Sequence, residues 1–360
     1  MQIIIYSISI KEIKQVFIST RHGIRTPFKG LPDDTIQWNC PQAHIKFQNN
    51  NQNLSNRSLK LNFDVKKLIK GSCYHGQLSQ EGYDQHLQLA KYWSSLYNIN
   101  NETIEKWKTR STVIDRVRLS LSGQLSQIKQ QNINVKVGSK FFDSAIVPGN
   151  CSNDKVYQNL IMSRVDPKLA ELEILRTKTK WNASWDQFGD HFKSRLAMNL
   201  PLPDNVVISD AQFAMQQMDD AWKACYQNPN QQELDKYLIM TIGPLVSDII
   251  KNQRENQNYI VSGHDTTIAP LAAILIQKDQ WTGKQPYFAS FISIELWDYD
   301  QQETVKIRVQ NLMMILQAFM LFKGHVAQLN VPQFSFNSIY KSMRLITKNK
   351  FVYVMNDLIF

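Results

Sequence analysis

The sequence predicts an α/β fold: a mixed central sheet flanked by helices, with an inserted, mainly helical cap domain. Three observations lead to this prediction. The β-branched and aromatic residues at 16–20, and the apolar run in NYIVSG after residue 257, each end on polar residues, as strands that run into a loop or a helix do. Residues 288–296 and 304–310 alternate in hydrophobicity like antiparallel strands. A block at 131–234 is mainly helical or irregular in pattern and resembles an insertion.

Helical periodicity accounts for the segments between these strands. Apolar residues recur at helical spacing over 80–97, and Ser79 stands where an N-cap is expected. The segment EKWKTRST is typical of a short strand that ends in a polar turn, and a helix follows it to about residue 130. We therefore expect one discontinuous α/β domain, 14–130 plus 235–350, and an α cap at 131–234 inserted into it.

Composition and charge exclude several classes of protein. The chain has 360 residues, of which 43% are hydrophobic, so it can bury a substantial core. Its formal charge of +10 attracts anions, which suits a phosphate-bearing substrate as well as a nucleic acid. No run of five or more Lys or Arg residues occurs, and no basic stripe has interleaved aromatic residues, so we expect no nucleic-acid binding. No apolar run approaches the roughly 18 residues of a membrane span, so we expect no stable membrane insertion.

Cysteines and glycosylation motifs bear on the cellular compartment. The four cysteines, Cys40, Cys73, Cys151 and Cys225, lack the spacing of zinc or redox pairs and suit either two disulfides or four buried thiols. Asn-x-Ser/Thr motifs favour the secretory route, and they begin at Asn53, Asn56, Asn101, Asn150 and Asn182. The apolar residues at 3–10 fit a first strand, an unstructured lead or a truncated signal peptide, since no complete signal is evident.

Two of the predicted strands end on histidine. The first runs into Arg21 and His22, and the second runs into His264 and Asp265. A third strand-like stretch ends on Arg110. Because open α/β sheets bind ligands beyond the carboxyl ends of their strands, we expect these side chains to meet at one edge of the sheet.

The stretch RHGIRTP at 21–27 matches the pattern Arg-His-Gly-x-Arg-x-Pro and resembles the histidine acid phosphatases, in branch 2 of the histidine phosphatase superfamily. Four further segments resemble that family in order and spacing: YHGQLSQEGYDQHLQLAKYW, TRST, GPLVSDII and SGHDTT. The resemblance spans about residues 15–312. It implies a phosphoglycerate mutase-like α/β core. The mutases themselves resemble only Arg-His-Gly and lack the Arg-x-Pro continuation and the His-Asp pair.

The resemblance also implies a mechanism that suits the residues present. A phosphoryl group keeps its negative charge through a loose transition state, so positioning and cationic stabilisation do most of the catalysis. Arg21, Arg25 and Arg110 would cradle that group, because guanidinium donates bidentate hydrogen bonds and stays charged. His22 would be the nucleophile that forms a phosphohistidine, and the arginines nearby would lower its pKa.

The remaining two site residues would complete the reaction. His264 would donate to a phosphoryl oxygen, and Asp265 would be the proton donor to the leaving alcohol, which favours acid pH. The histidines lack the spacing of metal ligands, so we expect no metal and no cofactor. The substrate would be a small phosphate monoester.

Three functions remain open within this resemblance. The first is an acid phosphatase of broad monoester specificity, the second is a phytase or inositol-polyphosphate phosphatase, and the third is a catalytically silent phosphate-binding protein. By resemblance the protein would be lysosomal or secreted, a glycoprotein with disulfides, and able to form a homodimer.

The chain departs from the family pattern at two places. Val113 follows Arg-Ser-Thr where the family usually has Asp, and the next acidic residue is Asp115. The cysteines that the family carries near its C-terminus are missing. Among three possible connectivities we expect Cys40 paired with Cys73 and Cys151 paired with Cys225, although Cys151 has no partner at the family's usual position.

Overall fold

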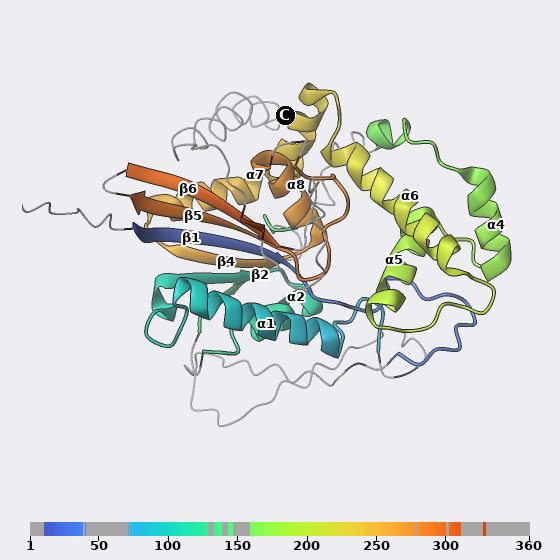
Figure 1. The fold of residues 1–360 in the computed structure, drawn as a ribbon, viewed down its shortest axis with the longest axis horizontal. Coiled ribbons are helices and arrows are strands. Elements are labelled where there is room, and N and C mark those ends of the chain that lie inside the picture. The colour runs from blue at the N-terminus through green and yellow to red at the C-terminus, as the bar shows by residue number, and fades with distance from the viewer. Residues whose placement is uncertain are drawn as a thin grey trace, which may run out of the picture.

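A computed structural model of the chain describes residues 11–38, 40, 71, 73–128, 133–138, 143–146, 159–276, 278, 280–299, 302–310 and 327–328. The described residues form a mixed α/β structure with a central sheet, as the sequence predicts (Figure 1). The lead at 1–10 lies outside these residues, and so do Asn53, Asn56, Asn150 and Cys151.

Within the described residues the sheet has seven strands, in the order β3-β2-β4-β1-β5-β6-β7. The strands are β1 (Lys11–Arg21), β2 (Trp107–Ser111), β3 (Val135–Val137), β4 (Asn258–Gly263), β5 (Phe291–Tyr299), β6 (Gln302–Gln310) and β7 (Ala327–Gln328). Strands β3, β2, β4 and β1 pair in parallel, whereas β5, β6 and β7 add to β1 in antiparallel order. The sheet is therefore mixed, and β1, the first strand of the chain, lies at its centre.

Helices cover both faces of the sheet. On one face lie α1 (Gln80–Tyr97) and α2 (Asp115–Gln124), and on the other lie α7 (Gln231–Arg254) and α8 (Asp265–Leu275) (Figure 1). A short 3₁₀ helix, Ile104–Lys106, precedes β2. Side chains alternate across β1, so that Ile18 packs in the cluster under α1 while Phe17 packs in the cluster under α7 and α8. Both faces of β1 are thus buried, which explains its unbroken apolar run.

The inserted block supplies a separate helical cluster beyond the carboxyl ends of β1 and β4. It contains α4 (Leu169–Thr179), α5 (Trp185–Ala197) and α6 (Ile208–Tyr226), which lie to the right of the sheet in Figure 1. Leu172, Trp181, Phe188 and Phe192 belong to its own hydrophobic cluster. One boundary differs from the prediction: Val135–Val137, expected in the cap, forms β3 and pairs with β2 at the sheet edge. The division into two domains otherwise stays a prediction.

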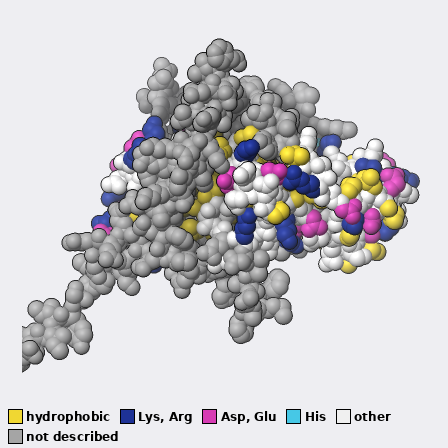
Figure 2. Space-filling view, turned by 90° about the horizontal axis from the view of Figure 1, so that it is seen from above, with side chains coloured by type: hydrophobic (Ala, Val, Ile, Leu, Met, Phe, Trp, Pro, Cys, Tyr) yellow, Lys and Arg dark blue, Asp and Glu magenta, His cyan; other side chains and the backbone are white. Residues whose placement is uncertain are grey.

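The described surface mixes charges of both signs. On the face shown in Figure 2, Lys and Arg side chains lie among Asp and Glu side chains, and hydrophobic side chains are scattered between them. A dispersed pattern of this kind offers no broad cationic stripe on the visible part of that face. Within the described part of the chain, no helix combines the length and the hydropathy that crossing a membrane requires.

One of the two expected disulfides is present. Cys40 and Cys73 are bonded, with their Cα atoms 5.3 Å apart. Cys225 is a free, buried thiol whose pKa is raised to about 11 by its burial. The expected pairing of Cys225 with Cys151 is therefore wrong for Cys225.

We predict that replacing Cys40 and Cys73 together by serine lowers the free energy of unfolding by about 3 to 4 kcal/mol, because the bond closes a loop of 33 residues in the unfolded chain. Urea unfolding followed by circular dichroism measures the loss. Peptide mapping under denaturing, non-reducing conditions should join Cys40 to Cys73 and find Cys225 alkylated. A Cys225 that resists alkylation would contradict the assignment.

Candidate active site

The pairing of β1 with β4 brings two distant histidines together. Arg21 is in register with Gly263, so His22 and His264 both follow at the same edge of the sheet. Their ring centroids are 5.7 Å apart. The His22 backbone N–H also donates to the Gly263 carbonyl at 3.1 Å, which continues the β1–β4 contact by one residue. The sheet itself therefore fixes the separation of the two rings.

The loop after β1 is clamped against the start of α1. Gly23 and Gly82 pass so closely that a Cβ on Gly23 would lie 2.2 Å from the Gly82 carbonyl oxygen, so a larger residue at either position would force them apart. Backbone hydrogen bonds join Thr26 to Gln77 and Ser79 to Ile24. The segment YHGQLS therefore holds the Arg-His-Gly loop rather than reacting itself.

His22 is held with one ring nitrogen available. Its Nδ1 lies 2.9 Å from the Gly23 carbonyl oxygen, which can only accept, so Nδ1 carries the proton. The Nε2 lone pair is then free for attack on an electrophile. Burial and the charges of Arg116, Arg21 and Arg25 hold the pKa of His22 well below its usual value of 6.5. The ring is therefore neutral in mild acid.

Two arginines from the first motif are completely buried beside His22. Arg21 forms an ion pair with Asp265 at 2.9 Å, and Arg25 forms one with Asp190 at 2.7 Å. The Arg21 guanidinium also donates to the Pro286 carbonyl. Asp190 lies on α5, so its bidentate contact ties the cap to the loop after β1. The Nε atoms of Arg21 and Arg25 are buried without a hydrogen-bond partner among the described residues.

The structure does not bring Arg110 to this group, which corrects its predicted role. The Arg110 guanidinium is paired with Asp143 and with Asp248, each at 2.6 Å, and also donates to the Ser144 hydroxyl. Its Nη1 and Nη2 atoms donate to these three oxygen partners, so Arg110 braces β2 against neighbouring segments. The prediction rested on the position of Arg110 near the end of β2, which suggested that its side chain reaches the sheet edge.

Arg116, in the first turn of α2, is the third arginine of the site. Its Nη2 lies 3.4 Å from His264 Nδ1, and its charge acts on His22, Arg21 and Arg25. Burial and the neighbouring Arg25 lower the pKa of Arg116 to about 9, and burial lowers the pKa of Arg21 to about 10. Guanidinium groups this crowded favour an anion between them, since an anion offsets their mutual repulsion.

His264 caps the start of α8, and its ring makes two hydrogen bonds. The arginine can only donate, so His264 Nδ1 accepts from Arg116, and Nε2 is left to donate to the Thr112 hydroxyl at 3.1 Å. Burial lowers the pKa of His264 to about 3. A donor role toward a phosphoryl oxygen, as expected from the sequence, requires exchange of one of these contacts when the ligand binds.

Asp265 is an anion in this arrangement. Its pKa is lowered to about 2 by Arg21 and Arg25, which outweigh the opposing effect of burial. Oδ2 accepts from Gln285 Nε2 at 2.8 Å, and the Gln285 Oε1 accepts from Lys193 of α5 at 2.7 Å. Because Lys193 can only donate, it fixes which end of the Gln285 amide faces Asp265.

Sequence reasoning missed Arg116, Asp190, Lys193 and Gln285. Arg116 could have been found, because a helix that starts at the ligand edge presents its first turn to an anion. The signal was weak for the others: Asp190 and Lys193 belong to the cap, and nothing local in the sequence shows that α5 packs over the site.

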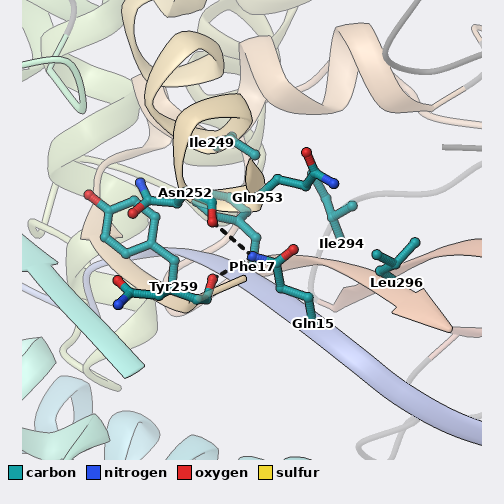
Figure 3. Close-up of a pocket in the computed structure, with 9 residues that line it drawn as sticks. Gln15, Phe17, Ile249, Asn252, Gln253, Tyr259, Ile294 and Leu296 are labelled. Carbon is teal, nitrogen blue, oxygen red and sulfur yellow. Dashed lines mark hydrogen bonds between the residues drawn. The ribbon is translucent and has the colours of Figure 1, made fainter. Parts of the chain in front are cut away.

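The described residues offer no metal centre that accounts for these groups. Among the described residues, no cluster of three or more His, Cys, Asp or Glu side chains could hold a metal ion. A cavity of about 30 Å³ lies instead near the start of β1, between the end of α7 and the sheet (Figure 3). There Gln15 donates to the Asn252 and Gln257 carbonyls. That volume is far below the roughly 300 Å³ of a small-molecule site.

Comparison with known proteins agrees with this geometry. Residues 12–126, which hold β1, α1, β2 and α2, match the histidine phosphatase superfamily (branch 2). This match covers about a third of the chain and agrees with the family that the motif at 21–27 resembles. Counting factor 60 of Dictyostelium discoideum is 24% identical over 334 residues, which cover 79% of this chain and 76% of that protein.

Solved structures of two phytases share the fold at low sequence identity. The phytase of Citrobacter braakii superposes with a TM-score of 0.59 at 15% identity and covers 93% of this chain and 98% of its own. A Klebsiella phytase gives a TM-score of 0.61 at 10% identity, with 94% of each chain covered. These likenesses confirm the predicted fold class.

We predict that Arg116→Ala and Arg110→Ala fail in different ways. Loss of Arg116 should weaken the binding of inorganic phosphate about 10- to 100-fold, because a charge-assisted contact is lost. Loss of Arg110 should lower the free energy of unfolding by about 3 to 5 kcal/mol, since Asp143 would stay buried without its partner. Titration calorimetry and thermal denaturation separate the two effects. If Arg110→Ala weakened phosphate binding in a stably folded protein, the corrected assignment would fail.

Proposed function

We propose that this histidine phosphatase hydrolyses phosphate monoesters through a phosphohistidine on His22, as an acid phosphatase. The observation that carries the proposal is the state of His22: a buried, neutral imidazole with its Nε2 lone pair available and three guanidinium groups around it. The attacking nitrogen has no proton to lose, and the cations around it stabilise the negative charge of the phosphoryl group.

The first half of the reaction transfers the phosphoryl group to His22. Arg21, Arg25 and Arg116 hold its oxygens while His22 Nε2 forms a bond to phosphorus and the ester P–O bond breaks. The electron pair of that bond leaves with the alcohol oxygen, which takes up a proton from Asp265. His264, beside Arg116, would contact one of the phosphoryl oxygens.

Asp265 must acquire its proton, because it is ionised in the free enzyme. A phosphate monoester loses its second proton with a pKa of about 6, so below that pH it brings one proton into the site. Its negative charge also competes with Asp265 for Arg21, which raises the pKa of Asp265. The proton can then pass from the ester to Asp265, and this requirement favours acid pH.

The second half restores the enzyme. A water molecule attacks phosphorus as the bond to Nε2 breaks, and Asp265, now a carboxylate, accepts a proton from that water. Inorganic phosphate leaves and takes the proton from Asp265, which pairs again with Arg21 as a carboxylate. The neutral ring of His22 returns with its Nδ1 proton still directed at Gly23. None of these steps calls on a metal ion.

We predict that hydrolysis of p-nitrophenyl phosphate keeps its kcat/KM as the pH falls from 6.5 to about 5. A pKa lowered from 6.5 means that His22 takes up a proton only at lower pH, whereas an ordinary histidine would lose about 16-fold of its neutral form between pH 6.5 and 5. Steady-state rates measured in constant ionic strength buffers, with and without EDTA, test this. His22→Ala should lose at least about a thousandfold in kcat, and unimpaired turnover by it would defeat the mechanism.

A second prediction concerns Asp265→Asn. An amide cannot supply the proton, so kcat for alkyl esters should fall about 100-fold or more, and kcat for p-nitrophenyl phosphate less than about tenfold, since nitrophenolate leaves unprotonated. Single-turnover release of the two alcohols measures the difference. Equal losses for both esters would remove Asp265 as the proton donor.

A phytase is the alternative function that we retain, and it is the activity named for the Citrobacter and Klebsiella neighbours. Release of phosphate from inositol hexakisphosphate, compared with that from p-nitrophenyl phosphate, distinguishes the two. A catalytically silent phosphate-binding protein is the remaining possibility, and it would bind phosphate but hydrolyse neither ester.

We also propose that the protein follows the secretory route, to lysosomes or to the cell exterior. A disulfide between Cys40 and Cys73 suits an oxidising compartment, and the motif residues Asn101 and Asn182 are exposed, as glycosylation requires. Association into a homodimer stays a prediction of the resemblance.

A further inference from the structure

Two half-exposed aromatic side chains stand directly beside the charged groups of the site. Phe28 is 51% exposed and Tyr287 is 48% exposed. The Phe28 ring centroid lies 3.6 Å from the Arg25 guanidinium carbon and 4.9 Å from that of Arg116. The Tyr287 ring centroid lies 5.2 Å from the Lys193 ammonium nitrogen. Two different loops therefore place a large ring beside the groups that would hold the phosphate.

The Phe28 ring is held in place. Its backbone N–H donates to Asp190 Oδ2 at 2.8 Å, the same carboxylate that holds Arg25. The ring contacts two guanidinium groups and still leaves half of the side chain in solvent. Gly76 of the YHGQLS segment, whose φ is +72°, lies next to the Phe28 ring. A ring fixed this way can bind a second flat group at little cost in conformational entropy.

Tyr287 marks the side from which the alcohol would leave. It contacts Lys193, which is linked through Gln285 to Asp265, the proposed proton donor. Its neighbour Phe288 is buried and lies 4.4 Å from the Arg21 guanidinium carbon. Aromatic surface therefore extends from beneath the phosphoryl cradle toward solvent, along the path of the leaving group.

The charges beyond the cradle do not favour a substrate with several phosphates. Three of the five carboxylates on α5 and α6 act on cations of the site: Asp186 and Asp190 act on Arg25, and Asp219 acts on Lys193. Asp219 lies 3.7 Å from Lys284 and also acts on Lys193, so neither lysine is an uncompensated cation. Desolvation beside the site and the charges of Asp190 and Asp265 raise the pKa of Asp186 to about 6. A polyanion would meet these carboxylates.

We propose that the site takes monoesters whose leaving group is flat and aromatic and bears no further phosphate, with Phe28 and Tyr287 as the residues that select it. This inference rests on the proposed phosphatase function and names the substrate class of that same site. Each ring contact of this kind changes affinity by about 2- to 10-fold.

The test compares benzyl phosphate with ethyl phosphate, two alkyl-type esters whose alcohols are similarly weak acids, so that the ring is the main difference. We expect kcat/KM for benzyl phosphate to exceed that for ethyl phosphate at least about tenfold in the wild type. Phe28→Ala and Tyr287→Ala should each reduce this ratio about 2- to 10-fold. Phe28→Leu keeps apolar bulk against Arg25, and it should reduce the ratio with the fold intact by circular dichroism.

Phe213→Ala is the matched control. Phe213 is an aromatic residue of α6, 37% exposed, whose ring packs on Trp185 away from the guanidinium groups. Its removal should leave the ratio of the two esters unchanged. A fall in the ratio as large as that of Phe28→Ala would mean that general loosening of the protein, rather than ring contact, sets the preference, and would overturn the inference.

Calorimetric binding of benzylphosphonate and methylphosphonate supplies a readout that needs no turnover. We expect benzylphosphonate to bind the wild type at least about tenfold more tightly, and Phe28→Ala and Tyr287→Ala to lose most of that advantage. Equal affinities, or tighter binding of inositol hexakisphosphate than of benzylphosphonate, would overturn the inference while leaving a phosphatase in place. Preferential binding of benzylphosphonate without hydrolysis of any ester would support the aromatic site and defeat the proposed function.

Discussion

Three guanidinium groups packed around one neutral histidine are the constraint on which the rest of this structure depends. Burying a cation is costly unless a carboxylate accompanies it, and burying several together adds their mutual repulsion. The fold meets that cost with acids from distant segments: Asp190 of the cap neutralises Arg25, and Asp265 at the start of α8 neutralises Arg21. The cap is therefore an electrostatic part of the site as well as a cover.

The carboxylates do not neutralise all of the positive charge in the site, and the remaining charge can bind an anion. The pKa values of His22, Arg21 and Arg116 are lowered first by burial and then by the positive charges that these groups exert on one another. By linkage, an anion that neutralises these charges must also bring those pKa values back toward their ordinary range. The affinity for phosphate and the lowered pKa values thus both follow from the positive potential of the site.

Much of the fold and half of the site followed from the sequence, for identifiable reasons. The strand that ends on His22 and the one that ends on His264 are continuous apolar runs, and parallel pairing in a buried sheet made their meeting predictable. Arg110 was misplaced because a strand end was given more weight than the helix start that follows it. Asp190 could not be found, because its partner Arg25 lies 165 positions away and only packing of the cap brings them together.

The central place of β1 has a consequence for how the chain is made. Its two neighbours in the sheet, β4 and β5, both come from the last third of the sequence, so β1 has no partner until about residue 263 has been synthesised and lacks its second partner until about residue 299. During that interval an apolar strand with both edges unpaired must be kept from aggregating. The helices α4, α5 and α6 are close in sequence and pack on one another, so they can form before β1 is paired. The histidine synthesised among the first residues is thus among the last to acquire its surroundings.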